Sequence, residues 1–231
     1  MSSLTLPDPA PLLAWYPTAA RDLPWRKTKD PYRIWISEIM LQQTRVEAVI
    51  PYYFNFLDYL PDVAALAGAP EELLLKLWEG LGYYSRVRNM KKAAIAVMER
   101  HGGVFPRTYE EIRALCGIGD YTAGAIASFA FDLPYPAVDG NVMRVVTRLC
   151  AYGAPITDPA VKKEITAAVA AAQPKSAPAL FNQAMMELGA TVCLPNGAPK
   201  CTACPMAAIC AAHRAGKETD FPQKTKKAPR R

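Results

Sequence analysis

The sequence has few of the features that mark membrane proteins, secreted proteins or histidine-dependent enzymes. Its longest nearly uncharged stretch, residues 121–131, is much shorter than the about 20 apolar residues that span a bilayer. No basic residue precedes Arg21, and early prolines interrupt the amino terminus, so we expect no secretory signal. With only two histidines and no Ser-His or phosphate-loop motif, triad hydrolases and kinases gain no support. We expect a cytoplasmic protein without membrane contact.

Most of the net positive charge lies at the carboxyl end of the chain. The composition, 51% apolar and 21% charged over 231 residues, is that of a folded protein with a substantial core. Five positive charges lie in residues 224–231, so the net charge of +6 falls to +1 without them. A nearly neutral body indicates a local rather than a broad nucleic-acid surface. Residues 222–231 lack an apolar face and are predicted to be a basic linker or tail.

Hydrophobic periodicity predicts an all-α protein. Apolar residues recur at intervals of three and four, whereas alternation with a period of two never lasts more than a few residues. Start and stop residues divide the pattern into nine helices. The first begins just after Pro31 and includes Ile34–Leu41, and the others cover residues 46–59, 71–78, 89–100, 108–115 (with a Thr-x-x-Glu capping box), 122–131, 140–152, 159–172 and 178–189. We expect the segment 193–210 to be a loop.

Four of the six cysteines lie in that loop: Cys193, Cys201, Cys204 and Cys210. Structural zinc usually takes two separated pairs of closely spaced ligands. The uneven spacing within one loop therefore favours a [4Fe-4S] cluster over zinc. Cys116 and Cys150 stand alone, and we expect both to be small core residues.

A glycine-rich turn, residues 115–119, joins two predicted helices. Gly117 and Gly119 allow unusual φ angles and close approach of the backbone. The N–H groups at the start of the next helix suit a DNA phosphate. The pattern is typical of a helix-hairpin-helix near residues 113–127, although an ordinary helical corner with a glycine cap fits equally well.

Two acidic residues are candidates for catalysis. Glu38 lies between Ile36 and Ile39, where a carboxyl group is costly unless paired or functional. Apolar surroundings raise a carboxyl pKa, so Glu38 is a candidate general acid, and a partly exposed or salt-bridged glutamate is the alternative. Asp139 opens the helix at residue 140 and is a candidate second acid, an N-cap, or both.

The hairpin, the acid about twenty residues further on and the cysteine loop together resemble the endonuclease III superfamily of base-excision DNA glycosylases, over nearly the whole chain. Within that superfamily, four segments resemble the MutY-type adenine glycosylases: Leu23–Arg26, Ser37–Thr44, Gly80–Arg86 and Phe181–Met186. The resemblance implies two helical subdomains. Residues 27–134 would form a six-helix barrel with the hairpin, and residues 1–26 with 135–221 an iron-sulfur cluster subdomain.

The resemblance also implies an activity. A monomer would bind double-stranded DNA of the nucleoid, flip out adenine opposite 8-oxoguanine or guanine, and hydrolyse its N-glycosidic bond. Glu38 would be the general acid and base, and an ionised Asp139 would stabilise the oxocarbenium-like sugar. Tyr121 and Asn141 would position Asp139 and the sugar. Bifunctional relatives have a Schiff-base lysine where this chain has Tyr121, so we expect no efficient strand cleavage.

Further residues would contact DNA by the same resemblance. Gln43 and Tyr83 would wedge into the base stack near the opposite base, and the turn at Gly117 and Gly119 would hold a phosphate. The adenine pocket would be lined by Leu23, Trp25, Arg26 and Gln183. Taken alone, Trp25 and Tyr83 fit core aromatics equally well, and Arg26 fits a surface charge.

Two features depart from the family pattern. Seven residues rather than the usual six separate the first two loop cysteines, and Cys116 replaces the usual hairpin proline. Full-length MutY-type enzymes also carry a Nudix-like domain that recognises 8-oxoguanine, and this chain ends at the linker. Two alternatives stay open: a relative that excises another mismatched or damaged base, such as thymine opposite guanine, and a non-catalytic helix-hairpin-helix module. The presence of both Glu38 and Asp139 argues against the non-catalytic module.

Overall fold

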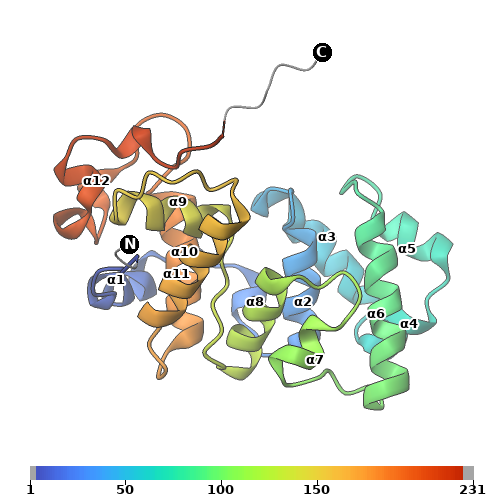
Figure 1. Cartoon of the computed structure of the whole chain (residues 1–231). Coiled ribbons are helices and arrows are strands. Elements are labelled where there is room, and N and C mark those ends of the chain that lie inside the picture. The colour runs from blue at the N-terminus through green and yellow to red at the C-terminus, as the bar shows by residue number, and fades with distance from the viewer. Residues whose placement is uncertain (1–3, 226–231) are drawn as a thin grey trace. The chain divides into compact units, whose positions relative to one another are not determined.

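The structure, a computed structural model, describes residues 4–225, and all regular elements among them are helical (Figure 1). The α-helices are α1 (Ala10–Ala19), α2 (Pro31–Met40), α3 (Val46–Tyr59), α4 (Val63–Gly68), α5 (Glu71–Leu77), α6 (Ser85–His101), α7 (Tyr109–Arg113), α8 (Asp120–Phe131), α9 (Gly140–Leu149), α10 (Pro159–Ala172), α11 (Pro178–Thr191) and α12 (Ala211–Arg214). Single-turn 3-10 helices are η1 (Pro24–Arg26), η2 (Cys201–Ala203), η3 (Ala207–Ile209) and η4 (Glu218–Asp220). Among the described residues, no helix is long and apolar enough to cross a membrane.

The all-α prediction is confirmed, and all nine predicted helices are present. Thr108 is confirmed as the N-cap of the predicted capping box, because its hydroxyl accepts a hydrogen bond from the Glu111 N–H, while the Glu111 carboxylate accepts from that hydroxyl. Three helices, α1, α4 and α12, were not predicted. Helix α1 escaped detection because prolines surround its start, yet proline suits a first helical turn. Residues 226–231 of the predicted basic tail lie outside the described residues.

The described residues divide into two units. We call residues 4–21 with 138–225 the terminal unit and Asp22–Ala137 the central unit. The predicted boundaries lie at residues 26/27 and 134/135, so they differ from this division by residues 22–26 and 135–137. Residues 22–26 belong to the central unit because η1 packs on α2 and the Trp25 ring contacts the Tyr53 ring of α3 edge-on at 5.4 Å.

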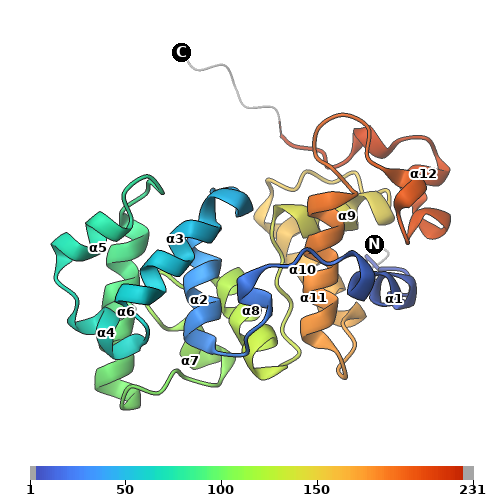
Figure 2. The ribbon, with the colours of Figure 1, turned by 180° about the vertical axis from the view of Figure 1, so that it is seen from behind.

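The central unit is built on the packing of α2 against α8 and of α4 against α6. Helices α2 and α8 lie side by side in both views (Figures 1 and 2). Small residues line the buried side of α8, and Gly124 is the tightest point. A Cβ atom added there would lie 2.2 Å from the Pro136 carbonyl oxygen. Only glycine therefore lets the chain after α8 return along the helix.

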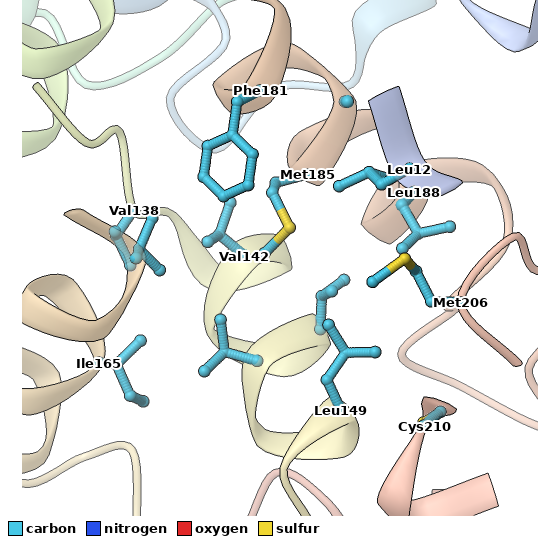
Figure 3. Close-up of a cluster of buried hydrophobic side chains, with 14 of the residues drawn as sticks. Leu12, Val138, Val142, Leu149, Ile165, Phe181, Met185, Leu188, Met206 and Cys210 are labelled. Carbon is cyan, nitrogen blue, oxygen red and sulfur yellow. The ribbon is translucent and has the colours of Figure 1, made fainter. Parts of the chain in front are cut away.

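The terminal unit joins the two ends of the chain in one core. Val142 of α9 lies beside Phe181 and Met185 of α11, and Leu149 of α9 belongs to the same cluster (Figure 3). Leu12 of α1 joins the same cluster and is fully buried. The amino-terminal helix is thus an integral part of this unit.

Replacing Gly124 by alanine should destabilise the protein by about 1–3 kcal/mol, because the new Cβ meets backbone atoms that must shift. Urea unfolding measures the change. Gly68→Ala is the matched control, since nothing lies within 4 Å of the Cβ position at the end of α4. Equal stability of the two variants would contradict the close approach.

Candidate active site and cysteine cavity

Glu38 is a buried carboxyl group in the last turn of α2. Its side chain lies among apolar neighbours and the residue is only 5% exposed. The Tyr121 hydroxyl of α8 donates a hydrogen bond of 2.7 Å to Glu38 Oε2. The alternative of a partly exposed glutamate is therefore wrong, and the structure brings together two of the predicted catalytic residues.

Local structure fixes this pair. The Asp30 side chain caps the start of α2 by accepting the Tyr32 N–H at 2.9 Å, and Pro31 occupies the first turn. At the other end of α2, the Gln42 amide lies 3.4 Å from the Thr122 hydroxyl of α8. The cap fixes the start of α2, and the contacts of Glu38 with Tyr121 and of Gln42 with Thr122 join its end to α8.

The predicted hairpin turn is present between α7 and α8, but its two glycines differ. Gly117 has a φ of 80°, and a Cβ atom there would lie 2.8 Å from Asn89. Gly119 has an ordinary φ of −93°, open space around its Cβ position, and serves as N-cap of α8. The special backbone expected at Gly119 is therefore wrong. In the first turn of α8, Asp120 forms an ion pair of 2.6 Å with Arg113.

The prediction for Cys116 is also wrong, because this residue is exposed rather than part of the core. It lies in the turn itself, where the Sγ atom is 3.6 Å from Asn89 Oδ1. Cys150 is half-buried against the core of the terminal unit, in agreement with its prediction.

The predicted pocket residues fall in both units. Leu23 and Trp25 are buried in the central unit, and Arg26 beside them is half-buried. The Trp25 ring packs on Tyr53, as the core-aromatic alternative expects. Gln183 belongs to α11 of the terminal unit, where its Oε1 atom accepts a hydrogen bond of 2.9 Å from the Tyr16 hydroxyl.

The two predicted wedge residues share an uncommon backbone conformation. Gln43 has a φ of 65° and Tyr83 a φ of 48°, both in the left-handed region. Both side chains are exposed, Tyr83 by 63%. The core-aromatic alternative for Tyr83 is therefore wrong.

Asp139 is the N-cap of α9 in the terminal unit, as its sequence position predicts. Its Oδ1 atom accepts the Val142 N–H and its Oδ2 atom accepts the Asn141 side-chain amide, each at 2.8 Å. Burial raises the pKa of Asp139, while these hydrogen bonds and the charge of Arg144 lower it in part. Asn141 thus favours the ionised form of Asp139.

Arg144 is a residue of this site that the sequence analysis missed. Its Nη2 group donates to Asn141 Oδ1 and to the Gly189 carbonyl, and its Nε group to the Cys193 carbonyl, each at 2.8 Å. The arginine orients the amide that contacts Asp139. An arginine among the valines of α9 was the available signal.

All four predicted metal ligands line one cavity of the terminal unit: Cys193, Cys201, Cys204 and Cys210. None of them forms a disulfide. Burial, with neighbouring acidic groups that include the other thiols, raises the pKa of Cys201 and of Cys204 to about 11. Such thiols stay protonated unless a metal displaces the protons.

The same cavity holds two residues that were not predicted, His213 and Glu218. They form a hydrogen bond, and their ligand atoms and Cys201 Sγ lie within 4.8 Å of one another. Arg148, only 3% exposed, places its Nη1 atom 3.3 Å from Cys193 Sγ. The donor set is thus four thiols with one imidazole and one carboxylate at the edge.

Comparison with known proteins identifies the family to which this helical chain belongs. The HhH-GPD superfamily of base excision DNA repair proteins matches residues 36–171. An adenine DNA glycosylase of Rattus norvegicus is 46% identical over 88% of this chain and 41% of its own length. One from Buchnera aphidicola (subspecies Baizongia pistaciae) is 43% identical over 86% of this chain and 56% of its own.

A solved thermostable thymine-DNA glycosylase superposes with a TM-score of 0.79 at 28% identity, over 89% of this chain and 94% of its own. The chain belongs to the HhH-GPD superfamily of base excision DNA repair proteins. It spans about half the length, or less, of the two adenine glycosylases described above.

Asn141→Ala should raise the pKa of Asp139 above its already raised value, because the carboxylate loses a hydrogen-bond donor. Carbon-detected NMR titration of the Asp139 carboxyl group measures the midpoint. Asn196→Ala, at an exposed loop asparagine, is the control. An unchanged or lower midpoint in Asn141→Ala would show that this bond does not favour the ionised carboxylate.

Proposed function

We propose that this chain is a monofunctional adenine DNA glycosylase that acts on adenine opposite 8-oxoguanine or guanine. The observation that carries the proposal is the buried Glu38 carboxyl group with the Tyr121 hydroxyl as its hydrogen-bond partner. Relatives up to 46% identical are named adenine DNA glycosylases, which supports adenine as the target base. The thymine-directed neighbour is less similar, at 28% identity.

Glu38 is the general acid of the proposed reaction. Adenine leaves slowly as an anion, so a proton delivered to its N7 atom makes it a better leaving group. As the C1′–N9 bond breaks, its electron pair passes to N9 and positive charge develops on the sugar. Water then forms a bond to C1′, and its proton passes to the Glu38 carboxylate, which restores the acid.

Asp139 stabilises the sugar cation in this proposal. Its ionised form is favoured by the N–H of Val142 and the amide of Asn141. Glu38 and Asp139 belong to different units of the chain. The likeness to the adenine glycosylases supports the assignment of both residues to one nucleotide. Asn141 contacts the Asp139 carboxylate, and Arg144 orients Asn141.

Strand cleavage is not part of the proposed activity. A lyase needs an amine that forms a Schiff base with the sugar, and the phenol of Tyr121 cannot do so. The hydroxyl instead positions the Glu38 carboxyl group through a bond of 2.7 Å. The product would be an intact strand with an abasic site.

We also propose that Cys193, Cys201, Cys204 and Cys210 hold a [4Fe-4S] cluster. Four thiols that converge on one cavity match the four-cysteine donor set of such a cluster. When bound, the cluster would tie the loop that contains these cysteines to α9 and α11, whose residues line the same cavity. Zinc held by Cys201, His213 and Glu218 is the competing assignment.

The function is tested by single-turnover cleavage of duplexes with A opposite 8-oxoguanine, A opposite G, T opposite G and A opposite T, with and without hot alkali. We expect strand breaks from the two A mispairs only after alkali.

Glu38→Gln should slow excision at least about 100-fold while mismatch binding survives, because general acid catalysis contributes this much or more.

The matched control is Glu72→Gln, which changes an exposed glutamate of α5 and should leave the rate unchanged. Excision of thymine but not adenine would redirect the proposal to another base. Tight binding without reaction on any duplex would support a non-catalytic module, and breaks without alkali would restore lyase chemistry.

The metal assignment is tested by metal and sulfide analysis of the purified protein. A [4Fe-4S] cluster contains four iron atoms and four sulfides per chain, and Cys204→Ser should lose both. His213→Ala should retain iron, since imidazole is not among the proposed ligands. Zinc in the wild-type protein, lost in His213→Ala, would contradict the cluster.

A further inference from the structure

One arginine of the central unit makes an unusual number of contacts with the backbone. Arg86, in the first turn of α6, directs its guanidinium group at carbonyl oxygens of two separate segments. Its Nη1 group donates to the carbonyls of Ile39 (2.8 Å), Met40 (3.3 Å) and Gln42 (2.6 Å). Its Nη2 group donates to those of Leu81 (2.9 Å) and Gly82 (3.2 Å).

The end of α2 needs such a partner. The carbonyls of Met40 and Gln42 lie at or beyond the last turn of α2, where the acceptors of a helix terminus lack partners within the helix. The Ile39 carbonyl accepts one long backbone bond, of 3.4 Å from the Gln42 N–H. A cation at a helix carboxyl end is also favoured by the helix dipole. Arg86 therefore caps the carboxyl end of α2, the helix that contains Glu38, and links this end to residues 81–82.

Each segment leads directly into one of the two exposed left-handed residues. Gln42, whose carbonyl accepts the shortest of these bonds, precedes Gln43, and Gly82 precedes Tyr83. A non-glycine residue in this region costs about 1 kcal/mol or more and persists only where its surroundings enforce it. The guanidinium of Arg86 is the group common to both segments.

Aromatic contacts fix the guanidinium itself. Its Cζ atom lies 5.3 Å from the centroid of the buried Trp78 ring and 5.8 Å from that of the Tyr83 ring. Trp78 Nε1 donates to the Gly82 carbonyl at 3.0 Å. The tyrosine thus rests on the same group that holds the backbone before it.

We propose that Arg86 is a positioning residue that holds Gln43 and Tyr83 ready, before DNA binds, to enter the base stack together. The inference rests on the proposed function, which assigns these two side chains to the wedge. It implies that one guanidinium group couples the two wedge residues to each other and to the helix of Glu38. The base stack of the DNA could then be opened without rearrangement of the segments that carry Gln43 and Tyr83.

Lysine cannot replace Arg86 in this role. A planar guanidinium offers five N–H donors in a fixed fork, whereas an ammonium group is a point charge with three. Arg86→Lys keeps the charge but loses the bridge between the two segments. The control is Arg88→Lys, at an exposed arginine of the same helix that pairs with Glu71.

The test uses a duplex with 8-oxoguanine opposite 2′-fluoro-2′-deoxyadenosine, which resists cleavage, and with 2-aminopurine beside the 8-oxoguanine. We expect Arg86→Lys to weaken binding about 10-fold, as the loss of charged hydrogen bonds does, and to reduce the rise in 2-aminopurine fluorescence. In a background that carries both Gln43→Ala and Tyr83→Ala, the same substitution should change binding less than about twofold, because residues that act together are not additive. Arg88→Lys should match the wild type.

Equal losses from Arg86→Lys in both backgrounds, or an unchanged fluorescence rise, would overturn the positioning role alone. If Tyr83→Ala and Gln43→Ala leave binding and fluorescence unchanged, the wedge assignment of the proposed function fails as well.

A second measurement, on the wild-type protein without DNA, applies if the Arg86→Lys variant does not fold. Backbone order parameters of residues 42–44 and 82–84 should be near 0.85, and values below about 0.6 would overturn the proposal.

Discussion

The hydrogen bond between the Tyr121 hydroxyl and the buried Glu38 carboxyl group is the contact on which the central unit depends. A carboxyl group away from water is costly unless a partner compensates, and the partner here comes from a different helix. Helices α2 and α8 must therefore pack in one register. Small residues on α8 and the close approach at Gly124 allow this packing.

Arginines that donate to backbone carbonyls organise both units. Arg86 joins the end of α2 to the segment before Tyr83. In the terminal unit, Arg144 joins the Asn141 side chain to the Gly189 and Cys193 carbonyls. Arg148 donates to the carbonyls of Leu194, at the start of the cysteine loop, and of Phe221, after its end. In each case one guanidinium fork holds segments that are far apart in the sequence.

The sequence predicts the features that depend on local patterns. Nine helices follow from apolar periodicity, and the caps at Thr108 and Asp139 follow from residue type and position. The gathering of four cysteines in one cavity follows from their density in a short loop. Glu38 stands out because a charge in an apolar helix needs a reason.

The contacts of Arg86 escaped prediction because its hydrogen-bond partners are backbone carbonyls, which every residue has and no side-chain pattern reveals. For Arg144, the position among valines signals a buried arginine, but two of its three partners are again backbone carbonyls. The exposure of Cys116 escaped it too, because a lone cysteine carries no periodic information.

The central chemical claim is that Glu38 protonates adenine at N7. It is tested most directly by single-turnover kinetics on a duplex with 7-deazaadenine opposite 8-oxoguanine, which has a carbon in place of that nitrogen. The account predicts binding close to that of the adenine duplex with excision reduced about as far as by Glu38→Gln. Excision of 7-deazaadenine at a rate comparable to adenine would contradict the claim.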